Sequence, residues 1–245
     1  MRNIKLEIQF DGTDYHGWQT QKQDRTVQKT VQDCVSKIVN SEVKLHGSGR
    51  TDAGVHALGQ VANFSSDTLI DLDSLKKGLN SLLPDDIIIS SVEECGQTFH
   101  SRYSAKSRTY WYFVWNFTEA SPFHSRYSWH IFKPLDLNAM KQAAASLIGV
   151  HDFSSFQGAD KEEVKPIREV QKVRFKKVGK HILLFEIQAN AFLKHMVRNI
   201  MGSLVDIGKG KQPSSWLCEV LEKKDRTFAA ATAPAQGLFL KKVEY

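Results

Sequence analysis

The sequence predicts an α+β protein built from two related halves, each with the element order β-α-β-β-α-β. Segments that alternate apolar and polar residues, as half-buried strands do, are interleaved with segments whose apolar residues recur at helical spacing. This order occurs twice along the chain and implies antiparallel sheets that carry helices on one face. The composition is 41% hydrophobic and 24% charged, which excludes collagen, a coiled coil and a disordered chain.

The first half, residues 1–100, begins with a strand over 3–10, because Ile4, Leu6 and Ile8 alternate with polar neighbours. The other elements expected in this half are helices over 27–40 and 73–82 and strands over 43–48, 57–65 and 85–92.

The second half, residues 101–245, begins with an aromatic strand over 107–116. Tyr110 and Tyr112 share one face of this strand and Trp111 lies on the other, so at least one face belongs to the core. A tyrosine near a cleft could also stack on a planar base, as aromatic residues do in single-strand RNA recognition. The remaining elements expected here are helices over 136–148 and 192–207 and strands over 167–177, 181–190 and 237–244.

The positive charge of the chain is unevenly distributed. The formal net charge is +6, but residues 161–245 hold 17 Lys/Arg against 9 Asp/Glu, whereas residues 1–160 hold 16 against 18. A basic last third is typical of proteins that bind a polyanion. Nucleic acid is favoured over a membrane, because the basic residues are spread over predicted strands and helices and do not form a terminal tail. A merely solvated basic surface is the alternative.

The cysteines and the apolar segments indicate a cytoplasmic protein. Cys34, Cys95 and Cys218 are widely spaced and odd in number, so neither a disulfide framework nor a zinc site is predicted, and a reducing compartment fits best. The chain begins with an alternating strand pattern rather than the apolar run of a signal peptide. No segment reaches the roughly 18–20 apolar residues that a membrane span requires.

The most unusual local feature is the glycine-rich stretch GSGRTDAGVHA at residues 47–57, between two predicted strands. It fits a tight hairpin loop with a solvated ion pair, since glycine is common in tight turns. It equally fits a loop whose backbone approaches a ligand, with Asp52 projecting from a rigid turn as nucleophile or general base. Neither GxxxxGK[ST] nor GxGxxG is present, so a nucleotide-phosphate loop is not predicted.

Arg198 is a charged residue within the apolar helical pattern over 192–207. On a helix, Lys194 and Arg198 lie four residues apart and share a side, while Met196 and Ile200 belong to the apolar side. A half-buried guanidinium is tolerated only when it is paired. A nearby acidic residue is the simplest partner to expect.

Seven motifs, in order along the chain, are similar to those of the TruA family of tRNA pseudouridine synthases. The resemblance runs from residue 4 to the last predicted strand, so it covers essentially the whole chain, and seven ordered motifs are far more specific than a single loop. The motifs are GTDYHGWQ (12–19), SGRTDAGVHA (48–57), FHSR (99–102), RTY (108–110), HDFSSF (151–156), the segment 192–202 and APAQGL (233–238).

This resemblance implies the isomerisation of uridine to pseudouridine at positions 38, 39 and 40 in the anticodon stem-loop of tRNA, without a metal or cofactor. It also implies a homodimer and a catalytic cleft between the two halves. By the same resemblance, the catalytic aspartate is Asp52, the active-site tyrosine is Tyr110, the arginine that pairs with the aspartate is Arg198, a loop arginine is Arg50, and a leucine of the uracil pocket is Leu238.

The chemistry of the reaction fits these residue types. The N1–C1′ bond breaks, the uracil turns while it stays bound, and C5 joins C1′, so no redox agent is needed. An ionised Asp52 can attack C1′, add to C6 or abstract the C2′ proton, and the sequence leaves all three routes open. Because the uridine lies in or beside a stem, it must flip out, and Arg50 is the candidate to fill the vacated space or hold the phosphate. The basic residues expected to contact tRNA phosphates are Lys165, Arg168, Lys172, Arg174, Lys176 and Lys177.

Two alternative functions use the same scaffold. One is a paralogue with the same chemistry that acts on another RNA, such as rRNA. The other is a non-catalytic tRNA-binding protein, which would require that the catalytic positions be replaced. Asp52, Tyr110 and Arg198 are all present in this chain, and their presence favours the enzyme.

Overall fold

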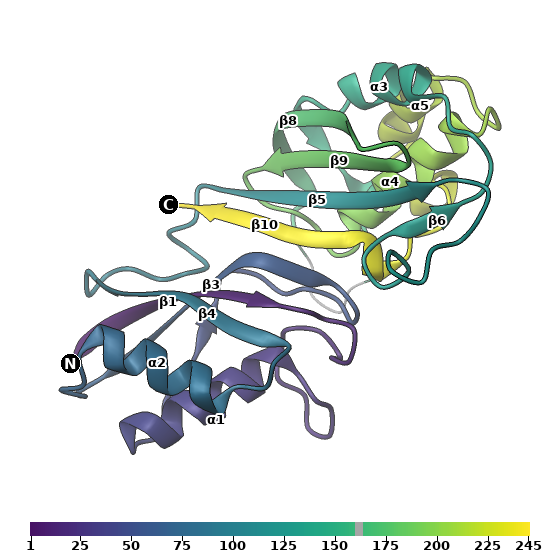
Figure 1. Cartoon of the computed structure of the whole chain (residues 1–245). Helices are drawn as coiled ribbons and strands as arrows, with labels where there is room; N and C mark the ends of the chain where they lie inside the picture. The colour runs from purple at the N-terminus through teal and green to yellow at the C-terminus, as the bar shows by residue number, and fades with distance from the viewer. Residues whose placement is uncertain (160–163) are drawn as a thin grey trace. The chain divides into compact units, whose positions relative to one another are not determined.

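The chain divides into two units, each with its own sheet and helices. The computed structural model describes residues 1–159 and 164–245. Unit 1 comprises Met1–Lys106 and Phe239–Tyr245, and unit 2 comprises Ser107–Leu238. Strands and helices are mixed in both units (Figure 1), so the predicted α+β class is confirmed.

Unit 1 follows the predicted order β-α-β-β-α-β and adds one strand from the end of the chain. Strand β1 pairs antiparallel with β3 on one side and β4 on the other. Strand β3 also pairs with the short β2 and with β10, so the strand order is β4-β1-β3-β10. The elements are β1 (Arg2–Phe10), α1 (Val27–Val39), β2 (His46–Gly47), β3 (His56–Ser66), α2 (Leu72–Leu82), β4 (Ile87–Cys95) and β10 (Leu238–Glu244).

The two helices of unit 1 cover the same face of its sheet (Figure 1). Helix α1 buries Val27, Val31 and Val35, and α2 buries Leu75 and Leu79. These residues recur every four positions and therefore form one apolar stripe on each helix. The predicted amphipathic character of both helices is confirmed.

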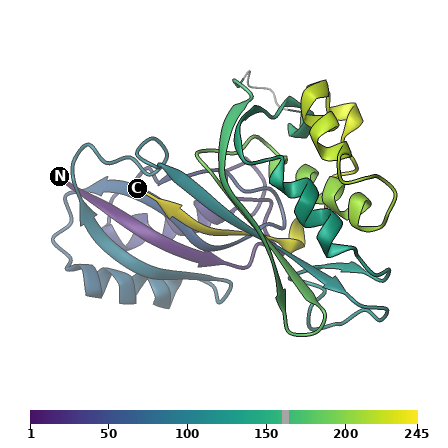
Figure 2. The same ribbon diagram turned by 90° about the horizontal axis from the view of Figure 1, so that it is seen from above.

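Unit 2 contains an antiparallel sheet in the order β5-β9-β8-β7, and β6 joins the edge of β5 in parallel. Its helices lie on one face of this sheet (Figure 2). Within the described ranges, no helix of either unit is long and apolar enough to cross a membrane. The elements are β5 (Ser107–Asn116), β6 (Trp129–Ile131), α3 (Leu137–Ala145), β7 (Gly149–Asp152), β8 (Ile167–Val178), β9 (Ile182–Ala189), α4 (Met196–Gly208) and α5 (Trp216–Lys223).

The last strand belongs to a different unit from the one expected. The sequence places the division near residue 100 and assigns residues 237–244 to the second half, whereas Phe239–Tyr245 form part of unit 1. Phe239 and Leu240 pair in parallel with β3, and the Phe239 ring stacks on His56 with 4.6 Å between centroids. An alternating pattern identifies a strand but not its partner, which explains the difference.

Some element boundaries differ from those expected. Helix α4 begins at Met196 rather than at 192, because His195 adopts a left-handed conformation with φ 61°. Lys194 therefore precedes the helix and does not share a helical side with Arg198. Only His46–Gly47 of the expected strand over 43–48 is a strand. The elements that the sequence did not predict are β6, β7 and α5, which are too short for a periodic pattern to stand out.

Candidate active site

Asp52 lies at the turn of the loop that connects β2 to β3 in unit 1. The turn closes where the Val55 amide donates to the Asp52 carbonyl at 3.2 Å, and Gly54 has a positive φ of 75°. Asp52 is half-buried and Arg50, two residues earlier, is exposed. The loop therefore presents both predicted side chains from one short segment.

A buried polar network fixes the segment that leads to Arg50. The Ser48 hydroxyl donates to Gln60 Oε1 at 2.6 Å, and Gln60 Nε2 donates to the Gly49 carbonyl at 3.0 Å. The Ser48 amide donates to the Val61 carbonyl at 2.8 Å. Buried polar groups with complete hydrogen bonds add rigidity, so the start of the loop is held to β3.

Residues 12–18 pack against the other side of the same loop. The Trp18 amide donates to the Thr51 carbonyl at 3.1 Å, and the Gly54 amide donates to the Tyr15 carbonyl at 3.3 Å. A Cβ atom on Gly12 would lie 2.0 Å from the Val55 carbonyl oxygen. Glycine is therefore required at position 12 by the close approach of two backbones.

Tyr15 fixes residues 12–18 to Asp86, the residue directly before β4. Its hydroxyl donates to Asp86, and Arg25 donates to both the Tyr15 hydroxyl and Asp86 at 2.8 and 2.9 Å. Burial raises the pKa of Tyr15 above its usual value, and the hydrogen bond to Asp86 raises it further. Tyr15 therefore stays a neutral hydrogen-bond donor. Residues 12–18 are held to Asp86 through Tyr15 and to the Asp52 loop through Trp18.

Tyr110 lies on β5 of unit 2, opposite Ile187 of β9. Its side chain is buried with 8% exposure, and its ring meets Phe192 edge-on with 5.0 Å between centroids. Tyr112 lies on the same face two residues later, and its hydroxyl donates to the Pro234 carbonyl at 2.8 Å. Tyr110 and Tyr112 are both buried while Trp111 between them is half-buried, which confirms the predicted shared face of the two tyrosines.

Arg198 lies in the first turn of α4 and is held by the backbone of Ala233. Its Nε donates to the Ala233 carbonyl at 2.8 Å, and the Ala233 amide donates to the Arg198 carbonyl at 3.1 Å. This main-chain contact was not expected from the sequence, and the acidic partner that the sequence predicts for Arg198 stays a prediction. Burial raises the pKa of Tyr112, and the positive charge of Arg198 opposes that rise.

Asn199 is a supporting residue that the sequence reasoning missed. It is fully buried and donates to the Phe156 carbonyl at 2.8 Å, while its Oδ1 accepts from the Thr232 hydroxyl at 2.6 Å and from Arg226 at 3.2 Å. These bonds hold the segment before Ala233 to α4. The sequence could have indicated this role, because Asn199 lies inside the apolar run VRNIMG and a buried amide requires hydrogen-bond partners.

Leu238 follows the 3₁₀ turn Ala235–Gly237 and is 6% exposed. A Cβ atom on Gly237 would lie 2.6 Å from Cζ of Tyr112, so this turn packs directly on β5. Within unit 2, the structure brings the face of Tyr110 and Tyr112, the first turn of α4 and residues 233–238 into one region. Asp52 and Arg50 lie together in unit 1.

The predicted phosphate-binding residues lie in different environments. Lys172 and Arg174 pair with Glu186 at 2.9 and 3.2 Å. Burial opposes ionisation of Glu186, but the hydrogen bonds from Lys172 and Trp111 and the two positive charges outweigh it and lower the pKa of Glu186. Arg168 donates to two carbonyls, at 2.6 Å each, and burial lowers its pKa. The six basic residues therefore do not form a uniform surface.

Comparison with known proteins identifies the family. A sequence profile described as tRNA pseudouridine synthase matches residues 7–104 and 143–245. A protein of Thermoanaerobacter sp. (strain X514) named tRNA pseudouridine synthase A is 44% identical over the full length of both chains. The chain belongs to this family. Asp52, Arg198 and Leu238 lie within the matched stretches, whereas Tyr110 lies between them.

Other members of the tRNA pseudouridine synthase family are similarly close. The protein of Thermodesulfovibrio yellowstonii named tRNA pseudouridine synthase A is 42% identical over all of both chains, and that of Francisella tularensis subsp. novicida is 42% identical over 100% of this chain and 95% of its own. Among solved structures, the archaeal box H/ACA Nop10–Cbf5 complex aligns with 82% of this chain and 44% of its own at 11% identity and a TM-score of 0.37.

Within residues 1–159 and 164–245, no group of three or more His, Cys, Asp or Glu side chains is placed to hold a metal ion.

Proposed function

We propose that this protein isomerises uridine to pseudouridine at positions 38, 39 and 40 of the anticodon stem-loop of tRNA, with Asp52 as its catalytic carboxylate. Membership of the tRNA pseudouridine synthase family carries this proposal. The setting of Asp52 supports it, because a loop held on both sides keeps a half-buried carboxylate in a defined position. Such preorganisation is what a catalytic side chain needs.

The reaction conserves the atoms of the substrate. The N1–C1′ bond breaks, the uracil rotates while it remains bound, C5 bonds to C1′, and the proton on C5 is lost while N1 gains one. An ionised Asp52 serves in any of three ways: it attacks C1′, it adds to C6, or it removes the C2′ proton. Each route needs a carboxylate and no oxidant or reductant.

The residues of unit 2 have separate proposed roles. Tyr110 stacks on the uracil and assists proton loss from C5, Leu238 lines the uracil pocket, and Arg198 supplies the positive charge that keeps the catalytic carboxylate ionised and oriented. The bond between Arg198 Nε and the Ala233 carbonyl supports this role, since it fixes the plane of the guanidinium. Arg50, exposed beside Asp52, is proposed to occupy the space that the flipped uridine leaves, or to hold its phosphate.

Arg198→Lys tests the role of the guanidinium. Lysine keeps the charge but lacks the planar fork and the Nε donor, so kcat for pseudouridine formation should fall by about 10- to 100-fold, the equivalent of losing a charge-assisted hydrogen bond of ~1.5–3 kcal/mol. Single-turnover kinetics with a tRNA transcript measures this, and Arg174→Lys, which changes an exposed arginine of β8, is the control. A raised KM with unchanged kcat would refute the catalytic role.

The substrate is tested by release of tritium from tRNA labelled at C5 of uridine. The protein should release tritium from a tRNA anticodon stem-loop and leave labelled rRNA unchanged. Pseudouridine mapping in a deletion strain should show loss at positions 38, 39 and 40 only. Loss of pseudouridine from rRNA instead would favour the paralogue, and no loss from any RNA would favour the non-catalytic tRNA-binding protein.

We also propose that the protein is a cytoplasmic homodimer. The family resemblance supports dimerisation, and the three unbridged cysteines Cys34, Cys95 and Cys218 fit a reducing compartment. Sedimentation equilibrium should give about twice the 27.8 kDa chain mass. A single species at the chain mass would contradict the dimer.

A further inference from the structure

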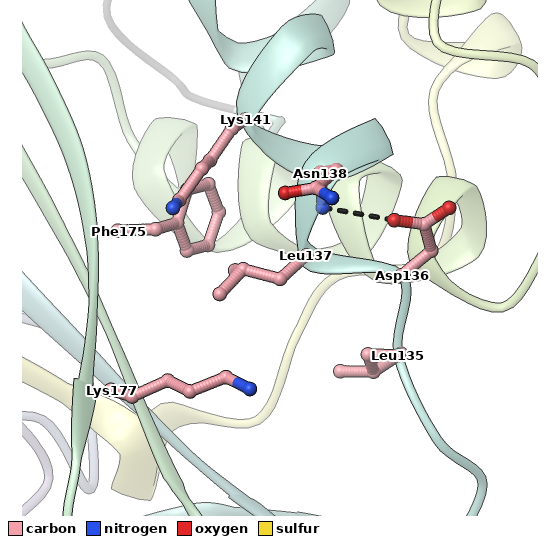
Figure 3. Close-up of a pocket in the computed structure, with 7 residues that line it drawn as sticks. All are labelled: Leu135, Asp136, Leu137, Asn138, Lys141, Phe175 and Lys177. Atoms are coloured by element: carbon pink, nitrogen blue, oxygen red, sulfur yellow. Dashed lines mark hydrogen bonds between the residues drawn. The ribbon is translucent and has the colours of Figure 1, made fainter.

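An open pocket of about 440 Å³ lies between the start of α3 and strand β8 in unit 2 (Figure 3). Its volume is within the range of small-ligand sites, about 300–1,000 Å³. Tyr110, Arg198 and Leu238 do not line it, so it is separate from the unit 2 residues proposed for catalysis. The lining residues are Leu135, Asp136, Leu137, Asn138, Lys141, Phe175 and Lys177.

Two ammonium groups enter this pocket from different elements. Lys177 extends from β8, and Lys141 extends from α3 toward the same strand (Figure 3). Within the described part of the chain, neither lysine has a salt-bridge partner. By contrast, Lys172 and Arg174 on the same strand are paired with Glu186. The charge of the pocket is therefore available to an anion.

The one carboxylate in the lining is already engaged. Asp136 is the N-cap of α3, and its Oδ1 accepts from the backbone amides of Asn138 and Ala139 at 2.9 and 3.0 Å. The positive end of the helix favours this negative charge. The two lysines therefore outweigh Asp136, and the pocket has a net positive charge.

The apolar walls of the pocket favour an anion that also carries an apolar group. Leu135 and Leu137 form one side of the pocket, and Phe175 forms the other between the two lysines (Figure 3). Apolar walls of this kind suit a ligand that carries an apolar face, such as a ribose or a base, beside its phosphate. This combination of charge and apolar surface matches a nucleotide unit better than a bare inorganic anion.

We propose that this pocket binds a sugar–phosphate segment of tRNA, with Lys141 and Lys177 on the phosphate and the two leucines on the sugar. The proposal rests on tRNA being the substrate. In this proposal, the phosphate contact of β8 comes from Lys177 on the helix-facing side of the strand. The sequence alone predicted contacts from all six basic residues named above.

The test is the salt dependence of binding to an unmodified tRNA transcript, measured by fluorescence anisotropy with the full chain. Lys141→Gln and Lys177→Gln should each lower the slope of log K against log salt by about 0.7–0.9, and the double variant by about twice that. Lys180→Gln is the matched control, because it removes the same charge from the exposed turn that follows β8, outside the pocket lining. The control should leave the slope near the wild-type value.

Three outcomes would overturn the pocket as a tRNA site. One is a slope unchanged in the double variant, and another is an equal decrease in Lys180→Gln, which would indicate general surface charge. The third is saturable binding of uridine monophosphate that requires Lys141 and Lys177, which would indicate a free-nucleotide site.

Activity measurements separate this inference from the proposed function. At saturating tRNA, the double variant should keep the wild-type kcat and show only a raised KM, because no residue proposed for catalysis lines the pocket. If the wild-type protein forms pseudouridine but the slopes do not change, only the pocket assignment fails. If the wild-type protein forms none, the proposed function fails, whatever the slopes show.

Discussion

Asp52→Asn should abolish pseudouridine formation while leaving tRNA affinity nearly unchanged. The amide has the size of the carboxylate but is neither a base nor a nucleophile, so each of the three routes for Asp52 is closed. The loss should be at least about 10²–10⁴-fold, the range measured for a positioned acid–base group. The loop should keep its conformation, because its hydrogen bonds on the Ser48 side and the Trp18 side use other atoms.

Tritium release under single-turnover conditions measures the rate, and filter binding measures the affinity. Asp14→Asn is the control, since it removes an exposed carboxylate from the segment that packs on the same loop. Wild-type turnover by Asp52→Asn would show that the catalytic carboxylate lies elsewhere. A large loss of affinity would assign Asp52 to binding rather than to chemistry.

Gly12→Ala should destabilise unit 1 and lower activity, although residue 12 has no proposed part in the reaction. The added Cβ would lie 2.0 Å from the Val55 carbonyl oxygen, a backbone atom that cannot rotate away. Relief requires that residues 12–18 move away from the Asp52 loop. We expect a loss of about 1–3 kcal/mol in unfolding free energy, as for other overpacked sites, together with a reduced kcat.

Gly96→Ala is the matched control for that substitution. Nothing lies within 4 Å of the Cβ position at Gly96, and its φ is not in the left-handed region. The same chemical change should therefore be neutral, or stabilising by about 0.4–1 kcal/mol through the unfolded chain. Thermal and urea unfolding measure both variants. Equal stability of the two would contradict the close approach of the Gly12 and Val55 backbones.

Periodicity predicted the long elements of the fold well. The strand expected over 107–116 is β5 with the same limits, and the helix expected over 27–40 is α1, because both bury a regular face over many residues. Periodicity reports local burial and says nothing about which strand pairs with which. It therefore missed that β10 joins β3. The start of α4 was wrong because the left-handed conformation of His195 has no signature in the apolar pattern.

The glycine-rich loop shows what sequence reasoning could and could not provide for the site. At Gly47 the structure shows one packing reason for a glycine, because an added Cβ would meet the Trp18 side chain of the same unit. The sequence pointed to Arg198 but not to its hydrogen bond with the Ala233 carbonyl, because a main-chain carbonyl carries no residue-specific signal. The catalytic roles of Asp52, Tyr110 and Arg198 stay predictions that the variants above test.

The pairing of β10 with β3 has a consequence for the order of events during translation. Residues 107–238 are synthesised between the first and last parts of unit 1, which takes roughly 10 s at typical ribosomal rates. Throughout that interval, β3 lacks its parallel partner at His56 and Ala57, directly after the Asp52 loop. The nascent protein therefore carries an open sheet edge of the kind that can pair with another chain, and unit 1 gains its full sheet only after residues 239–245 leave the ribosome.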